Sequence, residues 1–508
     1  MKIAVDVMSI REDGSAGGAT GFAIELIKGF AARQGVQVVV LCADWNEALL
    51  RKCLPGNVDF CVMTGNRKYT GNARIDGFIE KVRNRIKKES ILLAKKVDVL
   101  CCPFSAATFK EKGIPTVSTI LDIQHEFYPQ FFDPIELSHR RQFYQNIVKN
   151  VERVVCISDY TKDTFCEKYG YPKERASTIY IAIQNRFDKK DDNILTKLNI
   201  EKDKYIVYPA NFWEHKNHKL LLNAFAMYAH ENKELKLVLT GNPLTQTDYY
   251  NELLRAMKID DRTVITGYIT NEELYSILSG AKGLIYPSLF EGFGIPVVEA
   301  MHLNKLIASS NQTSLPEIGC SAICYFDPRR PDDILSGINY IANNEMNDEI
   351  CAEYAQKLKD YETEKMIDAY LEVFREVIDD KLRCGFDEEL SGVYADSWSG
   401  KEILVKLNQK AGEKLKVRFS VPEFIKIDEK VKIEHNGIKK VVKVSCGDTV
   451  SLEEPVKNEY EEIKFTFSKT WSPKAVLKSE DERQLGVMVE EISVTDNGKT
   501  VNLKSYIN

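Results

Sequence analysis

The chain has 508 residues, of which 44% are hydrophobic and 28% are charged, so we expect two to four globular domains instead of a single core. The net charge of −6 offers no overall positive field, which argues against a nucleic-acid partner. No stretch reaches the roughly 20 apolar residues that a membrane-spanning helix needs, so any membrane contact is expected to be peripheral.

The amino-terminal segment and the cysteines indicate where the protein works. The sequence begins with MKIAVDVMSI, which has the character of a first β-strand and lacks the basic start and cleavage site of a signal peptide. The twelve cysteines show neither zinc-ligand nor redox spacing. We therefore expect a cytoplasmic protein with reduced thiols, no metal and no other cofactor.

Residues 1–190 alternate apolar β-rich segments with amphipathic helical segments. This alternation predicts a lobe of parallel strands covered by helices. Gly17 and Gly18 lie in a Gly-rich loop before the first helix, where backbone amides at the helix N-terminus attract anions. The loop does not match GxGxxG, so the sequence does not support a Rossmann dehydrogenase.

A basic amphipathic segment at residues 78–96 contains seven Lys or Arg against two Glu. Phe78, Val82 and Ile86 share one face of the helix predicted there. Basic amphipathic helices bind anionic membrane surfaces, which is one interpretation of this segment. The alternative is a helix that packs on the lobe and exposes its basic side to water.

After a polar segment, the alternation starts again over residues 200–382 and predicts a second α/β lobe. Helical periodicity over 349–382 indicates that this segment closes the second lobe. From 392 to 508 the pattern changes to alternating β-branched segments separated by turns, which predicts an antiparallel β-sandwich. Trp398 and Trp471 are expected either in the core of the sandwich or as a sugar-stacking platform.

The densest signal is YPSLFEGFGIPVVEAM, in which a strand leads through a Gly-containing turn into a helix. Gly292 and Gly294 let a ligand approach the backbone, and the helix N-terminus supplies partial positive charge. Glu291 and Glu299 can face one ligand and accept hydrogen bonds from its hydroxyl groups. The alternative is that the two glutamates only cap the turn and the helix.

Further strand ends fit a ligand site at the carboxyl edge of the second sheet. The segment YIVYPANFWEHKNH places Asn211 and Lys216 between a strand and a helix, where an ammonium group can stabilise the charge of a leaving group. The segment LTGNP contains Gly241, and ITGY ends at Tyr268. These last two are also consistent with simple strand-to-helix turns.

The spacing of Glu291 and Glu299 within EGFGIPVVEAM resembles the donor signature of the family 4 retaining glycosyltransferases. The resemblance extends over roughly residues 1–380. It implies the α/β GT-B fold, in which two Rossmann-like lobes face a cleft. The C-terminal antiparallel β-sandwich lies outside the resemblance and is similar to β domains appended to some bacterial surface-polysaccharide transferases.

The same resemblance implies roles for individual residues. Glu299 would hold the ribose of a nucleotide-sugar donor, and the backbone near Tyr268 would receive its base, at the edge that also carries Gly241. The donor sugar is assigned to four consecutive residues: Glu291, Gly292, Phe293 and Gly294. The diphosphate is assigned to Lys216, Gly17, Gly18 and Asn211, the last of which stands where the family has an arginine.

In the first lobe, STILDIQHEFYPQFF resembles the acceptor stretch of the family, in which His-Asp commonly follows a strand. Leu121 takes the place of this histidine, Asp122 is retained, and His125 is the nearest imidazole. Two roles are open for His125. It acts on the substrate as a catalytic residue together with Glu291 and Lys216, or it makes a structural hydrogen bond.

The resemblance implies metal-independent transfer of a sugar, with retention of the anomeric configuration, to a glycan or lipid-linked glycan acceptor. The context it implies is assembly of a surface polysaccharide, either O-antigen or capsule, with GDP-mannose as the first candidate donor. One alternative is a nucleotide-sugar epimerase or hydrolase on the same fold. Another is a catalytically inactive glycan-binding scaffold.

Overall fold

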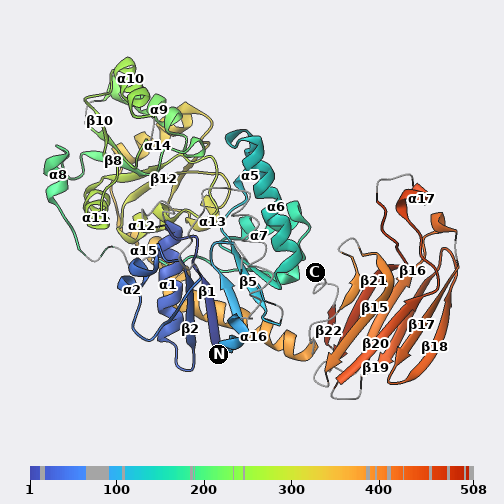
Figure 1. Ribbon diagram of the computed structural model, residues 1–508. Helices are drawn as coiled ribbons and strands as arrows, with labels where there is room; N and C mark the ends of the chain where they lie inside the picture. The colour runs from blue at the N-terminus through green and yellow to red at the C-terminus, as the bar shows by residue number, and fades with distance from the viewer. Residues whose placement is uncertain are drawn as a thin grey trace, which may run out of the picture.

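Two α/β lobes and a β-sandwich follow one another along the chain (Figure 1). The structure is a computed structural model. It describes every residue except 12–17, 64–90, 106–108, 112, 184–186, 188, 233, 244–245, 385–389, 395–396, 409–413, 427, 457–459, 478–480, 497–498 and 503–508.

The first lobe is built on a seven-stranded parallel sheet with the order β3-β2-β1-β4-β5-β6-β7. Its central strands are runs of buried valine, isoleucine and cysteine, as expected for a sheet that helices cover on both faces. The strands are β1 (Lys2–Asp6), β2 (Gln37–Cys42), β3 (Asp59–Val62), β4 (Val99–Cys102), β5 (Thr116–Ile120), β6 (Arg153–Cys156) and β7 (Ala176–Thr178). The helices are α1 (Gly18–Ala32), α2 (Glu47–Cys53), α4 (Ile91–Ala94), α5 (Gln124–Phe127), α6 (Pro134–Asn150) and α7 (Asp159–Tyr169).

The second lobe repeats this plan on a six-stranded parallel sheet with the order β10-β9-β8-β11-β12-β13. The strand order reverses between β8 and β11, the position at which open α/β sheets bind ligands. The strands are β8 (Tyr205–Pro209), β9 (Lys236–Thr240), β10 (Thr263–Ile265), β11 (Gly283–Tyr286), β12 (Leu306–Ser310) and β13 (Cys324–Phe326). The helices are α8 (Asn193–Lys197), α9 (His218–Glu231), α10 (Thr247–Met257), α11 (Asn271–Gly280), α12 (Ile295–His302), α13 (Leu315–Ile318) and α14 (Pro331–Asn343).

The segment predicted at 349–382 differs from the expectation. It forms two helices separated by a 3₁₀ turn: α15 (Asp348–Leu358), η5 (Lys359–Tyr361) and α16 (Thr363–Cys384). Helix α16 returns to the first lobe, where Ile367 fills the space over Gly29 of α1 and the Tyr370 hydroxyl lies 2.9 Å from Thr119 Oγ1. The expectation that the whole segment closes the second lobe therefore does not hold for α16. Periodicity identifies the apolar face of a helix but not the surface that this face packs against.

The C-terminal part, orange to red in Figure 1, contains two antiparallel sheets that enclose a hydrophobic core of their own. The strands are β14 (Ser391–Val393), β15 (Ser399–Asn408), β16 (Lys414–Ser420), β17 (Glu429–His435), β18 (Ile438–Val444), β19 (Thr449–Pro455), β20 (Tyr460–Phe467), β21 (Met488–Asp496) and β22 (Lys499–Asn502). Together with the two parallel sheets, they confirm the fold class expected from the sequence.

The two tryptophans of the sandwich touch each other. Their ring centroids are 4.9 Å apart at an interplanar angle of 70°, the edge-on arrangement that aromatic pairs prefer. Trp471 is buried and Trp398 is partly buried. This arrangement favours a core position for Trp471 over an open stacking platform.

Most of the basic segment, residues 78–90, lies outside the described residues, so its membrane role stays a prediction. Of its described residues, Ile91–Ala94 form α4, in which Leu92 is buried. Within the part of the chain that the structure describes, no helix combines the length and the apolar character that crossing a bilayer requires.

Candidate functional site

An ion pair between Lys216 and Glu291 lies where β8 and β11 end. Lys216 closes the 3₁₀ turn η3 (Glu214–Lys216) that follows β8, and its Nζ is 2.6 Å from Glu291 Oε1. The same carboxylate oxygen accepts a hydrogen bond from the Tyr286 hydroxyl at 3.1 Å. The two charged side chains are only 17% and 12% exposed, so the pair is largely removed from water.

The surroundings of Glu291 keep it ionised. Burial alone would raise its pKa, but the Lys216 ammonium, the nearby His215 and the hydrogen bond from Lys216 outweigh burial and hold the pKa below its ordinary value. Burial and the Lys216 charge lower the pKa of His215 to about 4, so this imidazole is neutral at pH 7. The Lys216–Glu291 pair therefore supplies one anion and one cation at fixed positions.

The turn that carries Lys216 is fixed by neighbouring strand ends. The Tyr208 hydroxyl donates to the Lys216 carbonyl at 2.8 Å, and the Leu289 amide donates to the His215 carbonyl at 2.8 Å. Asn217 adopts a left-handed conformation with φ 63°, which asparagine tolerates better than most residues. Its side-chain amide donates to the carbonyls of Pro287 and Pro328 at 3.1 and 2.7 Å.

The loop of residues 291–294, called the donor loop below, is held by the segment that follows β12. The Glu291 amide donates to Thr313 Oγ1 at 3.0 Å, and the Ser314 hydroxyl donates to the carbonyls of Glu291 and Phe293 at 3.0 and 2.9 Å. Gly294 has φ +122°, a conformation that favours glycine, and it is the N-cap of α12. Glu299 lies within α12 and is 1% exposed.

The donor loop also contacts the first lobe. A Cβ added to Gly292 would lie 1.9 Å from the Leu121 carbonyl oxygen and 3.1 Å from Asp122 Cβ, so only glycine fits against this strand end. Burial raises the pKa of Asp122, with the negative charge of Glu291 acting in the same direction and Lys216 opposing it. Asp122 of the first lobe therefore lies beside the donor loop, within electrostatic reach of the Lys216–Glu291 pair of the second lobe.

The remaining predicted donor residues lie along the same sheet edge or outside the described residues. Gly241 has φ +129° and pairs with Gly267, and its missing Cβ leaves room for the Ala210 carbonyl. Tyr268 is 64% exposed, and Asn211 is partly buried in the turn after β8. Gly18 begins α1, whereas Gly17 lies outside the described residues.

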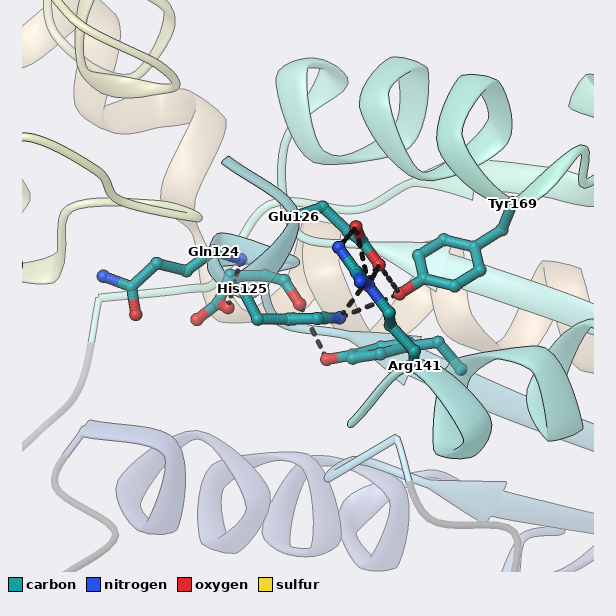
Figure 2. A network of polar contacts seen from close by, with 7 residues as sticks. Gln124, His125, Glu126, Arg141 and Tyr169 are labelled. Atoms are coloured by element: carbon teal, nitrogen blue, oxygen red, sulfur yellow. Dashed lines mark hydrogen bonds and ion pairs between the residues drawn. The ribbon is translucent and has the colours of Figure 1, made fainter. Parts of the chain in front are cut away.

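His125 lies in a polar network inside the first lobe (Figure 2). The Tyr169 hydroxyl donates to Glu126 Oε1 at 2.9 Å, so the His125 Nε2 that lies 2.8 Å from this hydroxyl carries a proton and donates to it. Arg141 binds the same Glu126 carboxylate at 3.0 Å, and the His125 ring stacks on Tyr144 at 5.1 Å. This position favours the structural role of His125, and direct contact with substrate stays a prediction.

The pKa of His125 gives a test that separates its two roles. Burial lowers this pKa to about 4, with Glu126 opposing the effect and the charges of Arg140 and Arg141 reinforcing it. Because the unfolded chain takes up a proton at higher pH than the folded one, this residue's contribution to stability is complete above about pH 6.5 and falls as the pH drops towards 4. The shift corresponds to about 3 kcal/mol.

We expect the His125→Gln variant, which keeps a donor for Tyr169, to lose this part of the pH dependence. Urea unfolding at pH 7 and pH 4.5 should show a smaller difference for the variant than for the original chain. Turnover at pH 7.5 should change by less than about threefold, because the glutamine amide can still donate to Tyr169 and a structural His125 takes no part in proton transfer. A loss of catalysis of about 100-fold would instead support direct action on the substrate.

Several residues at the site did not follow from the sequence. Thr313 and Ser314 anchor the donor loop, and Ser158 and Thr161 of the first lobe reach its Gly292 carbonyl. Only their position in the sequence could have pointed to these residues. Thr313 and Ser314 follow the carboxyl end of β12, and Ser158 and Thr161 follow that of β6. Small hydroxyl residues are so frequent in such turns that this signal has little power alone.

Comparison with known proteins assigns a family to each lobe. The family described as Glycosyltransferase Family 4 matches residues 16–184, and the family described as Glycosyl transferases group 1 matches residues 190–358. Together the two matches cover well over half of the chain. Each falls on one of the two parallel sheets.

Among curated proteins, the O-antigen chain mannosyltransferase B of Escherichia coli is 25% identical over 227 residues, which is 44% of this chain and 60% of that protein. The O-antigen chain mannosyltransferase RfbU of Salmonella typhimurium is 27% identical over 252 residues, which is 49% of this chain and 66% of that protein. The chain therefore spans less than two thirds of the length of each of these relatives.

Two solved structures share the arrangement of the lobes. A glycosyltransferase from Rickettsia africae covers 74% of this chain and 98% of its own, with a TM-score of 0.57 and 17% identity. HepE of Anabaena, solved in complex with UDP and glucose, covers 74% of this chain and 100% of its own, with a TM-score of 0.56 and 17% identity. These likenesses establish the GT-B fold. A glycosyltransferase family matches each lobe, so the chain belongs to the GT-B glycosyltransferases, with family 4 matched over the first lobe and group 1 over the second.

Proposed function

We propose that the protein is a retaining hexosyltransferase that takes a sugar from a nucleotide-sugar donor, with GDP-mannose as the first candidate. The acceptor is a glycan or a lipid-linked glycan in the assembly of a bacterial surface polysaccharide. The names of the two curated relatives, both O-antigen chain mannosyltransferases, support this choice of sugar and context. The proposed site of action is the cytoplasmic face of the membrane.

The observation that carries this proposal is the Lys216–Glu291 pair beside the amides of the donor loop. Its position, at the strand-order reversal between β8 and β11, is where an α/β sheet binds a ligand. A diphosphate would compete with Glu291 for the Lys216 ammonium. Once released, the Glu291 carboxylate would accept hydrogen bonds from the hydroxyl groups of the donor sugar.

In the proposed reaction, an acceptor hydroxyl attacks the anomeric carbon from the face on which the diphosphate leaves. The bond between the anomeric carbon and the diphosphate oxygen breaks, a bond to the acceptor oxygen forms, and the leaving diphosphate takes the hydroxyl proton. Lys216 stabilises the negative charge that develops on the leaving group. The chain's own contribution is therefore positioning and electrostatic stabilisation, with no enzyme nucleophile and no metal in the proposal.

The test is an assay with GDP-mannose and a mannose-terminated oligosaccharide acceptor, in the presence of EDTA, with the product linkage determined by NMR. An α-linked product from the α-linked donor supports retention. A β-linked product contradicts the mechanism, and activity abolished by EDTA contradicts metal independence.

Two alternatives predict different results in the same assay. A nucleotide-sugar epimerase or hydrolase would convert the donor equally fast without the acceptor. A glycan-binding scaffold would bind the oligosaccharide but convert no donor. The ionised Glu291 and its lysine partner favour the transferase, because a scaffold has no need of a buried ion pair at this sheet edge.

A further inference from the structure

The N-terminus of α7 in the first lobe is bound by a carboxylate of the second lobe. Glu317, the third residue of α13, accepts hydrogen bonds from the backbone amides of Asp159 and Tyr160 at 2.6 and 3.0 Å. These amides are among the first of α7, which have no partner within the helix. The partial positive charge of a helix N-terminus favours a carboxylate there.

The same end of α7 binds the donor loop. Ser158, the N-cap of α7, donates its hydroxyl to the Gly292 carbonyl at 2.7 Å, and Thr161 does so at 3.2 Å. Both hydroxyl residues are buried, so these bonds are shielded from water. Next to them, Phe290 packs its ring against Tyr160 at a centroid distance of 6.0 Å.

Helix α13 links these contacts to the ion pair. Ser314, the N-cap residue of α13, holds the carbonyls of Glu291 and Phe293, and Glu317 lies one turn further along the same short helix. Helix α13 spans only Leu315–Ile318, and the Ile318 amide donates to the Ser314 carbonyl at 2.9 Å, so its two ends are tied together by the backbone. A displacement of Glu317 from α7 would therefore shift the residue that holds the donor loop.

We propose that Glu317 is a positioning residue that makes the geometry of the donor loop depend on contact between the two lobes. With Glu317 seated on α7, the Gly292 carbonyl is held by Ser158 and Thr161 and the loop is fixed from both sides. With Glu317 released, the lobes separate and the loop loses the support of the first lobe. The contact between Glu317 and α7 is independent of the proposed function, whereas its consequence for donor binding rests on that function.

The experiment compares Glu317→Gln with a matched control, Glu353→Gln. Glu353 makes the same kind of contact within the second lobe, where it accepts from the Ser321 hydroxyl at 2.6 Å and the Ala322 amide at 3.0 Å. A glutamine has one acceptor oxygen and no charge, so at least one amide of α7 loses its partner in the first variant. Small-angle X-ray scattering of the ligand-free full chain measures lobe separation, and calorimetry with GDP-mannose measures donor affinity.

We expect Glu317→Gln to increase the radius of gyration and to weaken GDP-mannose binding about tenfold, the loss typical of one charge-assisted hydrogen bond. The melting temperatures of the two variants should agree within a few degrees, and Glu353→Gln should retain both the scattering curve and the affinity of the original chain. Equal scattering and equal affinity for both variants would overturn the proposal. If the original chain binds no GDP-mannose, the scattering result still decides the positioning role, and the proposed donor alone is wrong.

Discussion

Replacing Lys216 with methionine should lower the turnover number by about 10²–10³-fold, the loss typical of removing one group that stabilises charge in a transition state. Methionine keeps most of the side-chain volume but removes the ammonium group that we assign to the leaving diphosphate. The Michaelis constant for the donor should also rise, because the diphosphate carries its charge in the ground state as well. Steady-state kinetics at saturating acceptor measures both quantities.

The control is Lys219→Met, two residues into α9, where the lysine is exposed and pairs with Glu214 at 3.2 Å. This variant should be within about twofold of the original chain, because exposed ion pairs contribute little. Comparable losses for Lys216 and Lys219 would contradict the role of Lys216 and indicate a general effect of positive charge on this surface.

The Lys216→Met variant should also show a characteristic pH dependence of stability. With Lys216 present, the depressed pKa of Glu291 contributes stability above the unfolded value of about 4.3, and this contribution is lost as the pH falls. Without Lys216, the carboxylate is buried with no cation, so its pKa should rise and the variant should become less stable as the pH increases. The cost of breaking a buried pair is about 3 kcal/mol, and Glu291→Gln in the same chain should recover most of it.

Replacing Gly292 with alanine should reduce transfer activity by about 100-fold, the effect of displacing a reacting group by roughly 1 Å. The added methyl group would lie 1.9 Å from the Leu121 carbonyl oxygen, which is backbone and cannot rotate away. Either the donor loop or the first lobe must move, and both changes separate Glu291 from its present surroundings. Activity and the radius of gyration should therefore change together.

Gly56→Ala is the appropriate control for this substitution, since nothing lies within 4 Å of the position of its Cβ. It should leave activity, scattering and melting temperature unchanged. A Gly292→Ala variant with full activity would show that the contact between Gly292 and Leu121 is not needed for catalysis.

The elements of the molecule that depend on local pattern were predictable from the sequence. Buried parallel strands read as continuous apolar runs, and the donor loop was visible because a strand, two glycines and a helix start follow one another within a few residues. The juxtaposition of Lys216 and Glu291 was expected only through the family resemblance. In physical terms it follows from the parallel order of β8 and β11, which brings residues 75 positions apart to the same edge.

Long-range packing could not be predicted in the same way. The apolar face of α16 says nothing about whether it packs on the first or the second lobe, and it packs on α1. His125 lies three residues beyond Asp122 in the segment after β5, and its ring turns into the lobe to meet Tyr169. Glu317 looks like any acidic residue in a short helix, and its partners lie more than 150 residues away in the chain.

The most direct test of the account is an isothermal titration of the full chain with GDP-mannose, in parallel with UDP-glucose, UDP-galactose and dTDP-rhamnose. The same titrations are repeated for Glu299→Ala, which removes the buried carboxylate assigned to the ribose. We predict saturable binding of one nucleotide-sugar that is weakened at least about tenfold in Glu299→Ala, as expected for the loss of hydrogen bonds to a charged acceptor. Binding that is unchanged in this variant, or no binding of any of the four donors, would contradict the assignment of this sheet edge as the donor site.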